Sequence, residues 1–135
     1  MKRSTVLLLV VSFITNFAIA QKSNLNVTPS TSAIKNLIVA LNSDNNGLKR
    51  SAVYFAGYNK ISETVDQLID LLHSSNDDLS MKTLAAYALH QIGNEECMDA
   101  LKDAASHSGD IRLCSKCKLM YEDLLKVKSG IAYQS

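Results

Sequence analysis

An apolar stripe with helical spacing recurs along this chain and constrains its fold more than any other feature. Each copy places apolar residues at positions i, i+3, i+4 and i+7, which lie together on one face of an amphipathic helix. The first copy spans residues 34–41, the second follows 31 positions later over residues 65–72, and a weaker third spans residues 98–105. The chain therefore repeats a helix rather than alternating helices with strands.

A second helix is expected after each stripe, because a polar turn rich in helix-capping Ser, Asn and Asp follows it. These second helices are expected over residues 48–58, 79–91 and 111 to about 126. A period of 30 to 33 residues built from two helices is typical of a helical solenoid. The sequence thus predicts an all-α fold, a right-handed α-solenoid of about three helical hairpins and six helices.

Two of the second helices carry a recognisable pattern. Residues 48–57 and 81–94 resemble the second helix of short HEAT-like repeats, of the kind found in phycobilisome lyases. The resemblance covers residues 32–125 and implies a HEAT-repeat fold while saying little about function, because its residues are packing residues. His90 departs from the pattern, which has glycine there. The third repeat departs further and is expected to cap the stack.

The resemblance also assigns a role to three basic residues. Lys49, Lys82 and Arg112 match the basic position of the repeat, one in each hairpin. In the family such rows tie neighbouring repeats together, here beside Asp44 and Asp77. The same three residues are also candidates for a surface that contacts a partner.

The first 20 residues have the three-part layout of a secretory signal peptide: a basic start, an apolar run over residues 6–14 and small side chains before the cut. We place the cleavage site between Ala20 and Gln21. A transmembrane anchor is the alternative, but the apolar stretch ending at Ala20 has 15 residues, fewer than the roughly 20 that cross a bilayer. The protein is expected to be exported, to the periplasm or the cell exterior.

The composition of the chain limits the classes of protein to which it can belong. A net charge of +1, without a basic block, argues against an electrostatic nucleic-acid binder. With 47% hydrophobic and 20% charged residues, the chain can build a core. We expect a polar, flexible leader over residues 21–32, a repeat domain over residues 33–128 and a tail over residues 129–135.

Three cysteines leave several alternatives open. Cys114 and Cys117 form a C-x-x-C pair, which in an exported protein is compatible with a thiol-active redox site. If the last hairpin turns near residues 107–108, Cys97 lies level with Cys117, and a disulfide between them would staple that hairpin and leave Cys114 as a free or redox thiol. A Cys114–Cys117 pair, three reduced thiols and a zinc site completed by His107 or His90 are the other possibilities.

Aromatic residues suggest a contact surface. Tyr54, Tyr58 and Tyr87 lie on second helices, which line the inner surface of helical repeats, and are candidates for a partner surface. Phe55 shares a stripe with Leu48 and is expected in the core. No Ser-His-Asp triad, carboxylate pair or glycine-rich phosphate loop can be placed on one face. We therefore expect a non-enzymatic interaction or scaffold module without cofactor or metal, whose partner is a protein, a peptide or a second copy of the chain.

Overall fold

The computed structural model describes residues 30–130, and in this range the chain is all-helical. It contains six α-helices, one 3₁₀ turn and no strand among the described residues. The elements are α2 (Thr31–Leu41), α3 (Asn46–Tyr58), the 3₁₀ turn η1 (Ser62–Thr64), α4 (Val65–His73), α5 (Leu79–Ile92), α6 (Glu95–His107) and α7 (Ile111–Lys128). The six expected helices are confirmed. The expected signal peptide, most of the leader and most of the tail lie outside the described residues.

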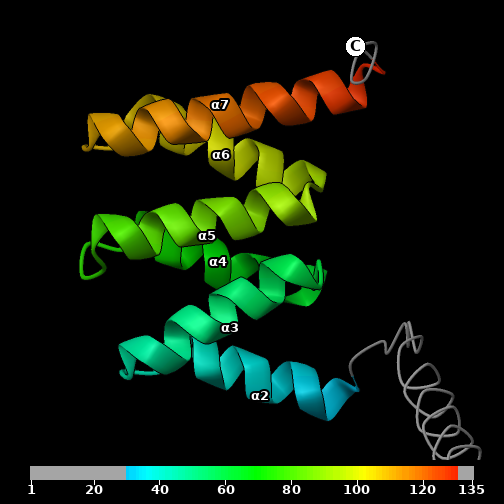
Figure 1. The fold of residues 1–135 in the computed structure, drawn as a ribbon, viewed down its shortest axis with the longest axis vertical. Coiled ribbons are helices and arrows are strands. Elements are labelled where there is room, and N and C mark those ends of the chain that lie inside the picture. The colour runs from blue at the N-terminus through cyan, green and yellow to red at the C-terminus, as the bar shows by residue number, and fades with distance from the viewer. Residues whose placement is uncertain (1–29, 131–135) are drawn as a thin grey trace, which may run out of the picture.

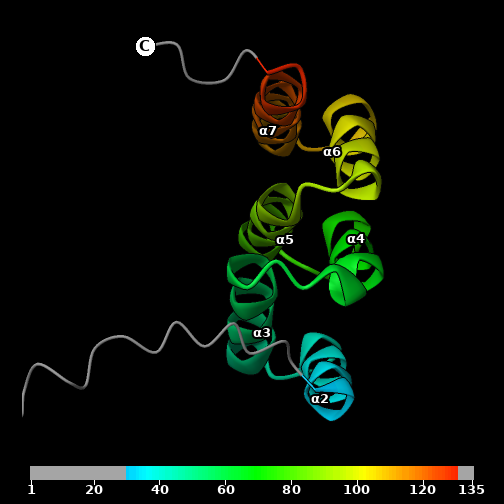
Figure 2. The same cartoon turned by 90° about the vertical axis from the view of Figure 1, so that its right-hand side faces the viewer.

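Consecutive helices pair into three antiparallel hairpins that stack one upon another (Figure 1). Figure 2 shows two layers, with α2, α4 and α6 in one and α3, α5 and α7 in the other. Within the second layer, α3 packs against α5 and α5 against α7, so each hairpin contacts the next through helices of the same layer. This stacking gives the described part of the chain, residues 30–130, two edges, formed by the hairpin of α2 and α3 at one end and the hairpin of α6 and α7 at the other.

The turns inside the hairpins repeat the same local chemistry. A serine hydroxyl in each turn accepts a hydrogen bond from the backbone N–H two residues later, at Ser43, Ser74 and Ser108. A side-chain oxygen of Asn45, Asp78 or Asp110 then caps the helix that follows, at α3, α5 and α7 respectively. Each cap satisfies a backbone donor that the first turn of a helix leaves without a partner.

One continuous apolar core lies between the two layers. Leu68 and Leu101, the central residues of the second and third stripes, are fully buried. The helices of the second layer contribute small side chains to this core, since Ala52 and Ala56 of α3 and Ala85 of α5 are buried as well. Small residues on the second helices let the layers approach closely, which accounts for the alanine-rich pattern of these segments.

Phe55 is the clearest error of the sequence-based prediction for the core. Its side chain is 51% exposed, whereas its helical neighbours Ala52 and Ala56 are buried. Phe55 lies on the side of α3 that faces away from α5, where a preceding hairpin would pack in a longer stack. Periodicity placed Phe55 on an apolar stripe correctly, but the hairpin that would bury it is absent from the described residues.

Equivalent positions in the three hairpins can be identified by counting from the residue that caps the second helix of each hairpin. The caps of α3 and α5, Asn45 and Asp78, are 33 residues apart, but the cap of α7, Asp110, follows after only 32. Lys49 and Lys82 both stand four residues after their caps, and the corresponding residue of α7 is Cys114. Arg112 stands only two residues after its cap, so it does not occupy the basic position that the resemblance assigned to it.

Candidate functional site

Two tyrosines form a stacked pair on the surface of α3. Tyr54 and Tyr58 are one helical turn apart, so their side chains leave the helix on the same side. Their ring centroids lie 5.9 Å apart with an angle of 17° between the ring planes. The rings are nevertheless 63% and 72% exposed. Two large aromatic side chains thus stack on each other while most of their surface contacts water.

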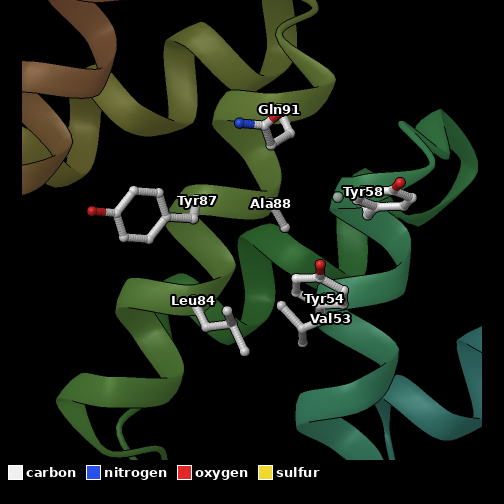
Figure 3. Close-up of a pocket in the computed structure, with 8 residues that line it drawn as sticks. Val53, Tyr54, Tyr58, Leu84, Tyr87, Ala88 and Gln91 are labelled. Carbon is white, nitrogen blue, oxygen red and sulfur yellow. The ribbon is translucent and has the colours of Figure 1, made fainter.

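The tyrosine pair forms one wall of a groove between α3 and α5. The groove has a volume of about 390 Å³. Figure 3 shows Tyr54 and Tyr58 rising from α3, Leu84 and Gln91 lying on α5, and the ring of Tyr87 directed away from the pair. The full lining consists of Val53, Tyr54, Gly57, Tyr58, Leu84, Tyr87, Ala88 and Gln91, none of which is charged.

The floor of the groove is set by a close approach of the two helices. Gly57 is buried, and its Cα faces Ala88 of α5 so closely that no side chain fits between them. Sequence reasoning selected the tyrosines but missed Leu84, Gln91 and this contact. The available signal was Gly57 itself, because glycine is unfavourable inside a helix unless close packing requires it.

The three basic candidates lie in different environments. Lys49 is only 16% exposed and pairs with Asp77, 3.4 Å away in the turn before α5, so it ties the first two hairpins together. Lys82 is half-buried and forms no ion pair with another described residue. The position equivalent to Asp77 in the next turn is Gly109, which accounts for the missing pair. Arg112 is exposed and binds its own capping residue. These residues do not form a shared basic surface.

The expected disulfide between Cys97 and Cys117 is not formed, since all three cysteines are free thiols. The reason is the length of the last turn. Because α6 ends at His107 and α7 begins at Ile111, the turn is centred on residue 109 rather than near residues 107–108. Cys97 is then level with Tyr121, and Cys117 lies about one helical turn, roughly 6 Å, away from that level.

Burial makes two of the thiols poor nucleophiles. Cys117 is fully buried, and this burial raises the pKa of its thiol to about 11, with a further contribution from nearby Cys114. Burial also raises the pKa of Cys97, against the opposing effect of the backbone N–H groups of Asn94 and Gly93. Exchange chemistry requires the thiolate, which a raised pKa disfavours. Cys114 is half-buried, and its thiol donates a hydrogen bond to the carbonyl of Ser108 at 3.2 Å.

The histidines bind single carboxylates. His90 of α5 lies 2.9 Å from Asp123 of α7, and His107 lies 2.9 Å from Asp103 one turn earlier on α6. His73 of α4 is 3.9 Å from the same Asp103. Within residues 30–130, no three His, Cys, Asp or Glu side chains gather in a group that could hold a metal ion. His90 and His73 therefore connect neighbouring hairpins.

Comparison of the chain with protein-family models, with curated proteins and with solved structures finds no match in any of the three. Every helix in residues 30–130 is too short or too polar to span a lipid bilayer. The groove beside the tyrosine pair is one of several hollows on the described surface, and it is the one that the stacked aromatic pair borders.

Proposed function

We propose that the protein is a non-catalytic interaction module of the HEAT-repeat type that holds an apolar segment of a partner protein in the groove between α3 and α5. The single observation that carries this proposal is the stacked, exposed pair of Tyr54 and Tyr58 beside an uncharged groove. Rigid tyrosines lose little conformational entropy on binding and supply large contact areas, which is why they are enriched among the residues that dominate interface energies.

The arrangement of the hairpins supports a HEAT-like, right-handed α-solenoid as the architecture. Three hairpins of two helices stack in register, and corresponding turns share a serine and a capping side chain. In such a solenoid the second helices of successive hairpins form one continuous face. Here that face carries Tyr54 and Tyr58 on α3 and Leu84 and Gln91 on α5, and these side chains line a single groove.

Export is part of the proposal and rests on the sequence of the first 20 residues. Cleavage between Ala20 and Gln21 would release a chain that keeps the six helices found in residues 30–130. The thiol-active alternative receives less support, because the burial of Cys117 and its pKa of about 11 oppose thiolate formation at neutral pH.

Selection from a displayed peptide library tests the binding function. Peptides enriched on the wild-type protein should lose at least about tenfold in affinity for the double variant Tyr54→Ser/Tyr58→Ser, since each buried aromatic anchor contributes more than 1 kcal/mol. Ile111→Ser is the matched control, because Ile111 is 80% exposed on α7, away from the groove. Peptides that bind the double variant as tightly as the wild type, or the absence of any enriched peptide, would overturn the proposal.

A further inference from the structure

Charged side chains are distributed unequally between the two layers seen in Figure 2. The helices of the second layer, α3, α5 and α7, carry eight basic and two acidic residues. The helices of the first layer, α2, α4 and α6, carry two basic and six acidic residues. Because first and second helices alternate along the chain, the net charge of +1 conceals this separation. The six acidic residues of the first layer are all exposed: Asp66, Asp70, Glu95, Glu96, Asp99 and Asp103.

Most of the positive charge of the second layer lies on α7, which contributes five of its eight basic residues. Two of the five form ion pairs, one with the cap of α7 and one with α6. Of the two acidic residues of α7, Asp123 binds His90, and Glu122 forms no ion pair within residues 30–130. The remaining basic residues of α7 are exposed and have no carboxylate within 4.0 Å in the described part of the chain: Lys116, Lys118 and Lys126.

A row of large exposed side chains joins α7 to the groove between α3 and α5. Tyr54, Tyr87 and Leu119 each stand nine residues after the cap of their helix, so they occupy equivalent positions in the three hairpins. Their side chains are 63%, 49% and 67% exposed. Tyr54 and Tyr87 line the groove, and Leu119 continues the row on α7. The outward surface of the second layer therefore runs without a break in position from the groove to α7.

This surface changes from uncharged to basic as it reaches α7. Lys116 stands six residues after its cap, the position that Leu84 occupies in α5, where it lines the groove. Lys126 follows Leu119 by seven residues and Lys116 precedes it by three, so all three lie on one side of the helix. An exposed apolar side chain on α7 is thus flanked along the helix by two lysines that have no partner among the described residues.

The apolar groove itself is not repeated between α5 and α7. The residue of α5 equivalent to Gly57, twelve positions after the cap, is His90. Its imidazole lies 2.9 Å from Asp123 and is 21% exposed, so it occupies space that is open beside Gly57. A segment that leaves the groove toward α7 therefore meets a polar surface and not a second apolar one.

We propose that the partner segment carries acidic residues beside its apolar part, and that these bind the outward side of α7 at Lys116 and Lys126. The inference rests on the proposed function, because the apolar part occupies the groove between α3 and α5. Packed helices lie 8–10 Å apart, so the centre of the groove is about 12–15 Å from the axis of α7. An extended chain covers this distance in about four residues. The expected segment has Asp or Glu about four positions from its apolar anchor.

Charge complementarity favours a protein segment over other anionic ligands. Anionic membranes are bound by clusters of four to eight Lys or Arg residues, whereas the outward side of α7 offers two without a described partner. Stable binding to nucleic acid likewise requires several phosphate contacts. A few exposed lysines beside an apolar groove instead suit a short segment in which apolar contacts supply most of the affinity and charge selects the sequence.

Peptides selected on the full-length wild-type protein from a random displayed library test the inference. At low salt, the enriched sequences should contain more Asp and Glu than Lys and Arg. Each selected peptide is then compared with a counterpart in which Asn and Gln replace Asp and Glu. The counterpart should bind about tenfold more weakly at about 20 mM salt, and the difference should nearly vanish at about 500 mM salt, because ions screen exposed charges.

The double variant Lys116→Gln/Lys126→Gln tests the location. It should bind the acidic peptide about fivefold more weakly than the wild type does and bind the neutral counterpart equally well. Lys35→Gln/Lys102→Gln is the matched control, because it removes the same charge from exposed lysines of the first layer that also lack an ion pair within residues 30–130. The control should bind both peptides as the wild type does.

The outcomes separate this inference from the binding function. If the selected peptides had no acidic excess, or bound Lys116→Gln/Lys126→Gln and the control equally, the inference would be wrong. The binding function would still stand if Tyr54→Ser/Tyr58→Ser weakened those peptides, and would fail if it did not. Neutral peptides together with binding to vesicles of phosphatidylcholine and phosphatidylglycerol, lost in Lys116→Gln/Lys126→Gln, would identify a lipid surface as the ligand of α7 and overturn the inference.

Discussion

Gly57 of α3 and Ala88 of α5 bring two helix backbones into contact. A Cβ atom built on Gly57 would lie 2.6 Å from the Cα and 2.9 Å from the Cβ of Ala88, distances that real Cβ atoms essentially never show. Only glycine on one helix and a small residue on the other permit this approach. The same contact forms the floor of the groove beside Tyr54 and Tyr58, so the shape of the proposed binding surface depends on it.

Replacing Gly57 by alanine should therefore destabilise the fold. A methyl group at this position forces α3 and α5 apart, which typically costs 1–3 kcal/mol or more, and the better helix propensity of alanine offsets only about 1 kcal/mol. We expect the free energy of unfolding to fall by about 2 kcal/mol, measured by urea denaturation. Gly109→Ala is the control, because a Cβ there meets nothing within 4 Å. If Gly57→Ala were as stable as this control, the close contact would be wrong.

The helices themselves could be predicted from the sequence, and the reasons are local. The apolar stripes around Leu37, Leu68 and Leu101 fix which residues face the core, and the polar turns with capping residues fix where the helices begin. These signals depend only on residues a few positions apart. They therefore do not require knowledge of which helix packs against which.

The sequence-based predictions were wrong where the position of a residue depends on long-range packing or on the length of a turn. Phe55 was placed in the core because periodicity cannot show that no hairpin among the described residues packs on that side of α3. The predicted pairing of Cys97 with Cys117 was wrong because the centre of the turn lies one to two residues later than expected. Such a shift changes the residue of α7 that faces a given residue of α6 by twice as many positions. Gly57 could be recognised as unusual within a helix, but Ala88 as its partner could not be identified without the crossing of α3 and α5.

The ion pair between Lys49 and Asp77 should contribute measurably to stability. Both side chains are largely buried, with exposures of 16% and 12%. Lys49→Met would leave the carboxylate of Asp77 poorly solvated and without its partner, and we expect a loss of about 1 kcal/mol in the free energy of unfolding. Lys82→Met is the matched control at the same helical position in the next hairpin. Its effect should stay within about 0.5 kcal/mol, since Lys82 forms no ion pair with a described residue. Equal losses in the two variants would contradict the structural role of the pair.

The three thiols should react with an alkylating agent at very different rates. In the native protein without reductant, Cys114 should be modified first, because Cys97 and Cys117 are fully buried and Cys114 is not. Intact-mass spectrometry should therefore show one rapid addition, and three additions once denaturant is present. The same spectrum reports whether the exported chain begins at Gln21.

A disulfide would change this result in a specific way. If only one thiol could be alkylated in denaturant without reductant, two cysteines would be joined, and the free-thiol arrangement would be wrong. A mixed disulfide between Cys114 and another protein would instead strengthen the thiol-active alternative. Cys114→Ser is the control, since it should remove the rapid addition and leave the two slow ones.

Stability should decrease at alkaline pH because of Cys117. Its folded-state pKa is raised from the ordinary value of 9.0 to about 11 by burial, so the folded state keeps a proton that the unfolded state releases. The resulting stabilisation is complete below pH 9 and is lost as the pH rises toward 11. Cys97, whose pKa is also raised by burial, acts in the same direction.

The comparison that isolates Cys117 uses Cys117→Ala, which fits sterically because Ala85 stands at the equivalent position of α5. At pH 7 the variant should be about 1 kcal/mol less stable than the wild type, owing to lost packing. In urea denaturation with reductant at about pH 10.5, this deficit should narrow, because only the wild type loses the Cys117 contribution. Met120→Ala, which removes another buried side chain of α7 without a titrating group, should show the same deficit at both pH values. If the stability difference between Cys117→Ala and the wild type did not change with pH, the thiol of Cys117 would have the same pKa in the folded and unfolded chains. Cys117 would then not be buried as the packing of α6 on α7 requires.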